Sequence, residues 1–549
     1  MAHPPNHHID AQSSNLGNNA ISDSSPHFSL LEKLPDEILL KIFKHFHHAT
    51  TLQGSHEYDP KAEHIETIMS ARLVCRRLCA IASHFLLDFV HVEPTEASIR
   101  RLECISEHEA VRKEIRGAHI SFAMYHPDLA NSLDLFVEGL REQFMDEELG
   151  EPFYYYGDEF FSPLVNHPQH KFLGSEEEYQ VLEAKGYAIS HAWLHGFLMA
   201  RSNGWKIKKY LLDAHQEYKR RFNKQKHLMK NNSFTTRIAW ALSKMPRMKY
   251  LMVNDKPIMN HFLGKQDIWQ ALQLGKPSMI AQRYIRPINS HISAKGWGHK
   301  VSVLFPIEAT LHLLAVLPQI GVHIQDLRCR LPIDSIKACH INCFPYYAGL
   351  RLMGVRLSHA DVSIPYRGSY LDGGDMTDIP QWTEKLLVAL LGASPLEYLR
   401  LSSKNMSAEN GISPLSTSVT TSVLGAHRQG NLRTLVLEDT TIAANTLQML
   451  MAPYKETDEN ANRPKLTITL SGVGLADWGP WEQALDLLRG GVDNASTIRF
   501  PWGNMNDLWS PQVHHIFSYW LHDGTSEAER YIHGEDIPNP FNGKIPGVY

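Results

Sequence analysis

The residues with the clearest potential for metal chemistry lie near the middle of the chain. Cys339, His340 and Cys343 fall within one short segment, and Cys329 precedes them. A structural zinc site normally needs two such groups of thiolate or imidazole ligands, and only one is present here. We therefore expect buried thiols at these positions and no metal or other cofactor.

Motifs that position catalytic groups are missing from the sequence. There is no Gly-x-Ser-x-Gly nucleophile turn, no phosphate-binding P-loop, and no Gly-x-Gly-x-x-Gly following a strand. We therefore expect a non-catalytic protein with no catalytic residues. An enzyme with an unrecognised site in residues 100–300 is the alternative.

A strongly basic segment, Trp205–Lys230, holds nine Lys or Arg residues against two acids. Its apolar residues recur at helical spacing, which predicts a long amphipathic helix with a basic outer face: Ile207, Leu211, Ala214, Tyr218 and Phe222. Such a face is ordinarily just solvated. The alternative is a docking surface for an acidic or phosphorylated partner, gripped by Arg220, Arg221 and Lys224.

Acidic residues dominate residues 142–159, which contain seven carboxylates and no Lys or Arg. Calcium loops need carboxylates at regular alternate positions and a turn glycine, and this spacing is absent. We expect a solvated acidic loop.

Composition describes an ordinary globular protein. The 549 residues are 43% hydrophobic and 21% charged, with a net charge of −5, which argues against a nucleic-acid partner. No run of about 18 apolar residues occurs, so no membrane contact is expected. Six cysteines without a secretory leader predict a cytoplasmic and/or nuclear protein. Residues 1–28, rich in Asn, Ser, His and Pro, predict a disordered leader.

Two short amphipathic helices are predicted close to the N-terminus. Pro35 suits a first helical turn, and Asp36 and Glu37 place negative charge at the positive end of the helix dipole. A second helical pattern runs from residue 71 to 82. Two short helices cannot close a core alone, so their apolar faces must be buried against something else.

The residues of these helices, Leu-Pro-x-Glu-Ile-Leu-x-x-Ile-Phe and then Arg-Leu-Val-Cys-Arg-Arg-Leu-x-x-Ile-Ala, resemble an F-box. The resemblance implies docking on a Skp-family adaptor in a cullin-RING ubiquitin ligase. It implies an F-box at residues 29–92. The connection at 47–69 departs from the family pattern because it is longer than the usual link, and we expect an inserted loop there that runs into a helix around residues 61–69. The implied adaptor-binding residues are Leu34, Pro35, Ile38, Leu39, Ile42, Phe43, Val74 and Leu78. An ordinary helical hairpin of a larger core is the alternative.

Beyond residue 233 a helix followed by Leu-x-x-Leu-x-Leu recurs, for example at Leu396–Leu401 and Leu432–Leu437. The step from Leu399 to Leu435 exceeds the length of about 20–29 residues typical of leucine-rich repeats. We predict a degenerate leucine-rich-repeat-like domain at 233–549. Residues 93–232 are expected to be an α+β connecting region with the acidic loop and the basic helix. A non-repeat α/β domain is the alternative.

The prediction is therefore an α+β protein in which an N-terminal helical F-box precedes an irregular leucine-rich-repeat-like helix/strand array. The resemblance implies a substrate-recognition subunit of an SCF-type ubiquitin ligase, with a Skp-family adaptor, a cullin scaffold and an unknown protein substrate as partners. A RING-type module would need several Cys/His pairs that the chain lacks, so the partners must perform any ubiquitin transfer. An adaptor-binding scaffold acting outside ubiquitination remains a second possibility.

Overall fold

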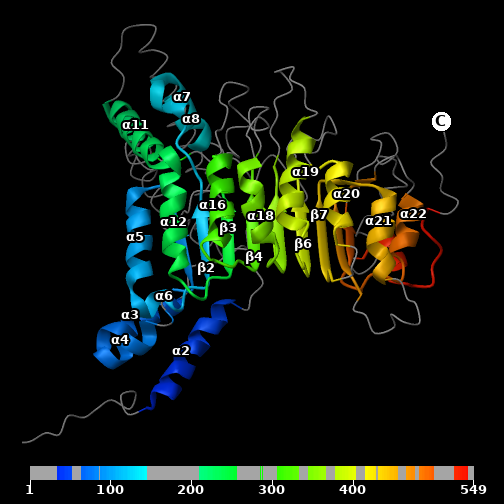
Figure 1. Cartoon of the computed structure of the whole chain (residues 1–549), viewed down its shortest axis with the longest axis horizontal. Coiled ribbons are helices and arrows are strands. Elements are labelled where there is room, and N and C mark those ends of the chain that lie inside the picture. Colours follow the sequence, from blue (N-terminus) through cyan, green and yellow to red (C-terminus); the bar gives the residue numbers. More distant parts are fainter. Residues whose placement is uncertain are drawn as a thin grey trace, which may run out of the picture. The chain divides into compact units, whose positions relative to one another are not determined.

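The computed structural model divides the chain into two compact units, residues 1–86 and 87–549 (Figure 1). The residues that the structure describes are 34–51, 63–83, 85, 87–144, 209–255, 285, 287, 306–332, 344–365, 378–403, 415–427, 431–454, 465–475, 481–499 and 525–541.

The described residues of the N-terminal unit form three helices, α2 (Asp36–Thr51), α3 (Glu63–Val74) and α4 (Arg76–Ser83). The predicted inserted loop at 47–69 begins too early, because α2 continues through Thr51, while the helix expected around residues 61–69 is present as the start of α3 at Glu63. The physical reason is that nothing between residues 47 and 51 interrupts a helix. The residues that favour a turn, Gly54 and Pro60, come later.

The predicted helical pattern from residue 71 to 82 is two helices, which meet at Cys75. The Cys75 sulfur accepts a hydrogen bond from the Leu78 backbone N–H at 3.4 Å, and its carbonyl accepts one from the Cys79 N–H at 2.8 Å. Cys75 therefore occupies the N-cap position of α4, where a side chain satisfies a backbone donor that the helix leaves unpaired.

The second unit is built on a nine-stranded parallel sheet in which every strand pairs with its neighbours in chain order. The strands are β1 (Phe89–Val92), β2 (Gly117–Ser121), β3 (Tyr250–Asn254), β4 (Asp326–Arg330), β5 (His359–Ser363), β6 (Tyr398–Ser402), β7 (Thr434–Glu438), β9 (Thr467–Ser471) and β11 (Thr497–Arg499). Two shorter strands, β8 (Thr441–Ile442) and β10 (Gly474–Leu475), form a separate pair.

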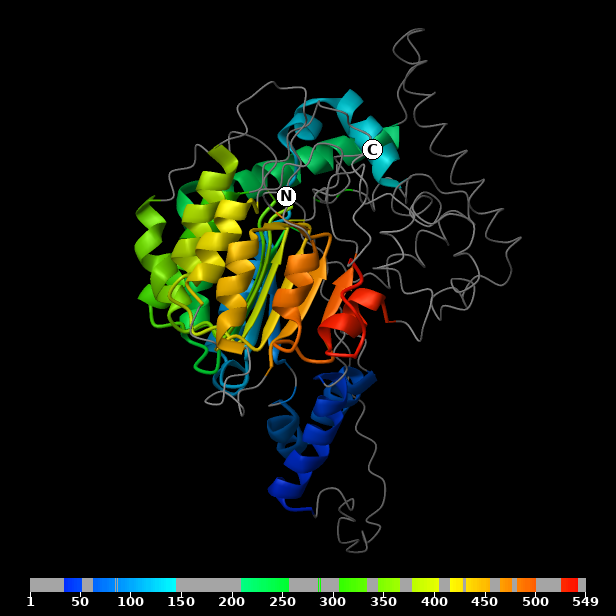
Figure 2. The same ribbon diagram turned by 90° about the vertical axis from the view of Figure 1, so that its right-hand side faces the viewer.

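Helices connect the strands and pack against one another in sequence (Figures 1 and 2). They are α5 (Glu96–Glu107), α6 (Glu109–Arg112), α12 (Ser233–Ser243), α16 (Ile307–Gln319), α18 (Tyr347–Gly354), α19 (Asp378–Leu391), α20 (Thr417–Gly425), α21 (Ala444–Met451), α22 (Trp481–Leu488) and α25 (Glu527–Ile532). A further group consists of α7 (Pro127–Asn131), α8 (Leu133–Phe144) and α11 (Lys209–Met229). Single 3₁₀ turns lie at Lys230–Asn232, Phe344–Tyr346 and Ala452–Tyr454.

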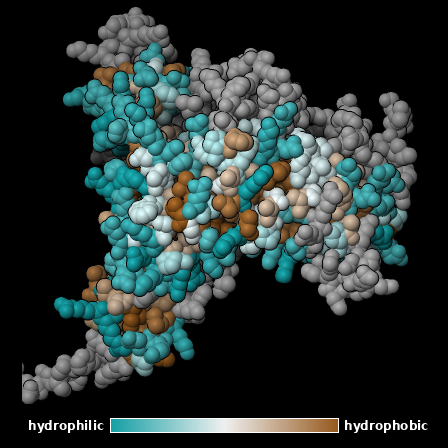
Figure 3. Space-filling model, viewed as in Figure 1, coloured by the Kyte–Doolittle hydropathy of each residue, from teal (hydrophilic) through white to brown (hydrophobic). Residues whose placement is uncertain are grey.

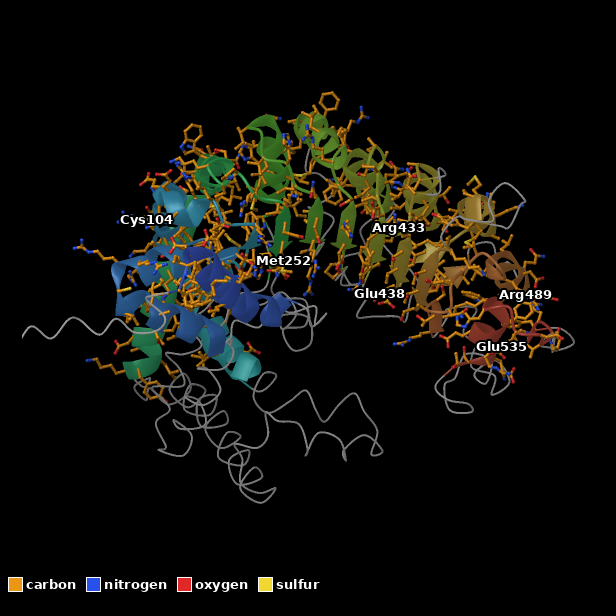
Figure 4. All side chains as sticks on the ribbon, turned by 90° about the horizontal axis from the view of Figure 1, so that it is seen from below. Cys104, Met252, Arg433, Glu438, Arg489 and Glu535 are labelled. Carbon is orange, nitrogen blue, oxygen red and sulfur yellow. The ribbon has the colours of Figure 1, made fainter. Side chains whose placement is uncertain are left out.

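Alternation along each strand explains this layering. In β3, Leu251 and Val253 are buried, and the residues that alternate with them, Tyr250, Met252 and Asn254, are exposed or partly exposed. The later strands repeat the pattern, and their inward residues join the helices in one continuous apolar core. Each strand therefore has one face under the helix layer and one open face, which lies on the inner side of the arc in Figure 4.

The mixed helix and strand composition agrees with the predicted α+β class, and helix/strand units do recur along the chain. The sheet, however, begins at Phe89 and not at residue 233, because β1 and β2 pair directly into it. Strands are expected from the sequence near both places, but Val, Ala and Ile occupy their inward positions, so the leucine spacing did not show that they belong to the repeating array. The units containing β5 and β11 were also missed. That the repeats are leucine-rich repeats in the family sense stays a prediction.

Candidate functional site

The structure sorts the eight predicted adaptor-binding residues into two groups. Leu39, Phe43 and Leu78 are buried in the core of the N-terminal unit, together with Ile68, Ile81 and Ala82. The Phe43 ring also lies 6.3 Å from the Phe85 ring, measured between centroids. These three side chains hold the helices together, so they cannot face a partner without unfolding the unit.

The exposed members of the predicted set are Pro35, Ile38 and Val74, while Leu34 and Ile42 are partly buried. Ile38 is 40% exposed and Val74 is 65% exposed. Figure 3 shows hydrophobic side chains on the surface of this unit. Sequence reasoning missed three further exposed apolar residues of α2 and α3, which are Leu40, Met69 and Leu73. Leu40 lies about 160° around α2 from Ile38. We name the remaining exposed group the F-box face: Pro35, Ile38, Met69, Leu73 and Val74.

Arg77 connects the two halves of the motif, a role that the sequence did not reveal. Its Nε donates a hydrogen bond to Asp36 Oδ1 at 2.8 Å, and its Nη2 donates to the Leu34 carbonyl at 2.5 Å. Arg77 is exposed, and it ties the start of α4 to the start of α2. These bonds fix the residues that begin α2, Leu34 to Asp36, against the start of α4.

The predicted basic helix is α11, and its buried stripe contains Leu211, Ala214 and Tyr218 as expected, while Phe222 is partly buried and Ile207 lies outside the described residues. Both predicted arginines bind within the protein. Arg220 and Arg221 each donate hydrogen bonds to Glu217, and this lowers the pKa of the Glu217 carboxyl to about 2. Arg221 also donates to the Ile285 carbonyl at 2.7 Å, and Lys224 is exposed.

Two buried polar side chains give α11 a structural role. The Tyr218 hydroxyl accepts a hydrogen bond from the His126 N–H at 2.8 Å. The Gln225 amide accepts from the Tyr125 N–H and donates to the Ala123 carbonyl. These bonds satisfy the backbone of the segment that leaves β2, where buried polar groups must be paired. A role of Arg220, Arg221 and Lys224 in binding a partner stays a prediction.

The open face of the sheet carries a row of aligned charged side chains. Register places Arg328, Asp361 and Arg400 next to one another on adjacent strands. Arg400 lies 2.8 Å from Glu438 on β7 and 3.6 Å from Asp361 on β5, so it bridges two carboxylates. Met252 and Glu438, both labelled in Figure 4, extend along this inner face.

Aromatic side chains form a second row along the same face. Phe89 and Tyr250 lie on strands separated by β2, yet their ring centroids are 6.0 Å apart. Gly117 permits this approach, because a Cβ there would collide with the Phe89 ring. Farther along, His359 stacks on Tyr398 with centroids 6.0 Å apart. Asp326 lies between the two pairs in the register, and burial raises the pKa of its carboxyl.

No group of three or more His, Cys, Asp or Glu side chains suited to a metal ion occurs among the described residues. Cys329 is fully buried in the sheet core, which raises the pKa of its thiol to about 12. Cys339, His340 and Cys343 lie outside the described residues.

A histidine pair, His91 and His119, begins the central row of the open face, with the two Nδ1 atoms 3.3 Å apart. Burial, then the neighbouring His119 and Arg101, lowers the pKa of His91 to about 4. The His91 imidazole binds a proton more readily in the unfolded chain than in the folded protein, so acid favours the unfolded chain. The contribution of His91 to stability is therefore complete above pH 6.5 and falls as the pH drops toward 4.

We expect the free energy of unfolding to fall by about 2 kcal/mol from pH 7 to pH 5 because of His91. The substitution His91→Asn should remove this part of the pH dependence. Denaturant titrations of both proteins at the two pH values measure the difference. His323→Asn, which changes an exposed histidine, is the control. An equal loss of stability in wild type and His91→Asn would contradict the assignment.

Among the described helices, none combines the length and apolar character needed to cross a bilayer. In the comparison with known families, residues 31–88 of this chain match the F-box-like family model. The predicted F-box resemblance is thereby confirmed for this segment, which contains all eight predicted adaptor-binding residues. Neither curated proteins nor solved structures give a match.

Proposed function

We propose that this protein is the substrate-recognition subunit of an SCF-type cullin-RING ubiquitin ligase. The observation that carries the proposal is the F-box-like segment at 31–88, whose helices leave apolar side chains on the surface. The side chain of Leu73 is 88% exposed and that of Met69 is 52% exposed. Contact of this apolar surface with water is unfavourable, and burial against an apolar partner surface would remove the cost. A Skp-family adaptor is the partner that the motif implies.

The target protein is proposed to bind the open face of the sheet. This face combines the Arg328–Asp361–Arg400 row with the aromatic row that includes Tyr250 and Tyr398. Charged rows suit selection among partners, and aromatic side chains supply contact area at low entropic cost. The protein would then act by proximity, holding a target near an enzyme that carries ubiquitin, without chemistry of its own.

A scaffold role and an enzymatic role are the two alternatives to the ligase function. A scaffold outside ubiquitination would use the same F-box face without recruiting a cullin. An enzyme would need a catalytic cluster, and the most perturbed histidine among the described residues, His91, pairs with His119 on the open face. Binding of an acidic partner to α11 through Arg220, Arg221 and Lys224 would be an addition to either function.

Affinity capture of the full chain from cells tests the proposal with three proteins. Wild type should retain adaptor, cullin and a set of further proteins. Ile38→Asp should lose adaptor and cullin but keep the further proteins. Tyr398→Ala with Arg400→Glu should keep adaptor and cullin and lose part of the further set.

Each link of the proposal can fail separately. Adaptor binding without cullin would replace the ligase with the scaffold function. If the Tyr398/Arg400 variant captures every protein that wild type captures, the open face is not the target-binding surface. Absence of the adaptor from the wild-type capture would overturn the whole proposal.

A further inference from the structure

The solvent-facing side of α18 carries exposed apolar side chains, whereas a helix that covers a sheet normally has polar residues there. The helix buries Leu350 and Met353 toward the core, as expected for a helix that covers a sheet. On the opposite side, Leu352 is 54% exposed and Val355 is 52% exposed. At 100° per residue these two side chains lie about 60° apart, so they form one stripe along the helix.

Neighbouring residues extend this stripe into a patch. Val388, on the exposed side of α19, is 36% exposed, and Phe344, just before α18, is 77% exposed. Helix α18 packs directly against both α16 and α19. Figure 3 shows hydrophobic side chains gathered over the middle of the helix layer. We name this group the outer patch: Phe344, Leu352, Val355 and Val388.

Two glycines let α18 approach the neighbouring helices α16 and α19 closely. A Cβ on Gly349 would collide with the backbone of Ala315 in α16, and one on Gly354 would collide with the Leu390 carbonyl in α19. Helix α18 is therefore drawn in against its neighbour on each side. The outer patch consequently spans adjoining helices at close spacing, which suits an extended contact better than isolated apolar side chains would.

Three of the four charged side chains described beside the patch are positive, and the fourth is the carboxylate Glu384 on α19. Arg351 and Arg356 lie on opposite sides of the Leu352–Val355 stripe, and Lys385 lies one turn before Val388. Among the described residues, none of these three basic side chains forms an ion pair. The one carboxylate with a described side chain on the two helices is Glu384, which accepts a hydrogen bond from Ser422.

The surroundings of the exposed Trp240 on α12 differ from those of the outer patch in how their basic side chains are paired. Basic residues of α12 and the following turn are matched by carboxylates. Arg237 binds Glu96 and Glu103, and Arg247 binds Glu114. The positive charge around Trp240 is thus neutralised within the protein, while that around the outer patch is not.

We infer that the outer patch docks an acidic amphipathic helix of a partner protein. The apolar face of that helix would cover Leu352, Val355 and Val388, and its flanking Asp or Glu side chains would meet Arg351, Arg356 and Lys385. Apolar anchors at helical spacing with charges on both sides are how grooves select helical ligands. This surface belongs to the helix layer and is separate from both the F-box face and the open sheet face.

The test measures binding of two fluorescent peptides to the full-length protein by anisotropy. Each peptide has about 20 residues with Leu along one helical face, flanked by Glu in one peptide and by Lys in the other. We expect the Glu peptide to bind and the Lys peptide to bind at least about tenfold more weakly. Leu352→Ser with Val355→Ser should weaken the Glu peptide about tenfold or more, and Arg351→Glu with Arg356→Glu should reverse the preference.

Trp240→Ser and Lys219→Glu with Lys230→Glu are the matched controls, since they change an exposed aromatic residue and two exposed lysines elsewhere. They should leave both peptides unaffected. Circular dichroism should be the same for all variants because every replaced side chain is on the surface. Equal affinity of wild type for the two peptides, or unchanged binding by the patch variants, would overturn the inference. Concentration-dependent dimers that Leu352→Ser with Val355→Ser abolishes would also overturn it, by making a second copy the occupant.

Discussion

Replacing Leu73 and Val74 together with aspartate should abolish binding of a Skp-family adaptor and leave the N-terminal unit folded. Both side chains point into solvent at the end of α3, so charge at these positions costs the isolated protein little. In an interface the same carboxylates would lose their hydration without a partner, which costs several kcal/mol. Calorimetric titration of the adaptor into wild type and variant measures the loss.

Two core substitutions provide the contrasting case. Leu39→Ala and Phe43→Ala should also lose the adaptor, but through unfolding, because each removes a buried side chain worth about 2–5 kcal/mol. The small apolar core of this unit leaves it little stability to spare. Proteolysis of the N-terminal unit should therefore accelerate in these variants and stay unchanged in the Leu73/Val74 variant. Adaptor binding that survives in the Leu73/Val74 variant would show that the F-box face is not the docking surface.

Gly354→Ala should destabilise the second unit by about 3 kcal/mol, a large effect for one added methyl group. The new Cβ would overlap the Leu390 carbonyl oxygen, which is backbone and cannot rotate away. Helices α18 and α19 must then separate, and the apolar residues between them lose contact along their length. Thermal unfolding monitored by circular dichroism measures the shift of the midpoint.

Ala348→Val is the control for this prediction, because it adds more atoms to the exposed side of the same helix. It should cost only the small helix-propensity difference, well under 1 kcal/mol. Equal effects of the two substitutions would mean that the close approach of α18 to α19 is not needed for stability. A large effect of Gly354→Ala should also weaken peptide binding at the outer patch, since Leu352 and Val388 lie on the two separated helices.

Local sequence determined the existence and type of most elements. Pro35 and the two following acids marked the start of α2, and the apolar stripe of α11 identified Leu211, Ala214 and Tyr218 as buried. These inferences succeed because helix caps and periodicity depend only on neighbours in the chain. The F-box motif itself was legible for the same reason, since its two halves are short and contiguous.

Only the tertiary structure decided which apolar residues of the motif face a partner. Ile38 and Leu39 are adjacent in sequence and equally hydrophobic, yet one is exposed and the other is buried. The distinction depends on where α3 and α4 pack, which periodicity within α2 does not contain. Likewise, the pairing of Arg220 and Arg221 with Glu217 and the membership of β1 and β2 in the sheet required distances in space. Sequence spacing shows which residues share a face, but burial of that face depends on what the rest of the chain places against it.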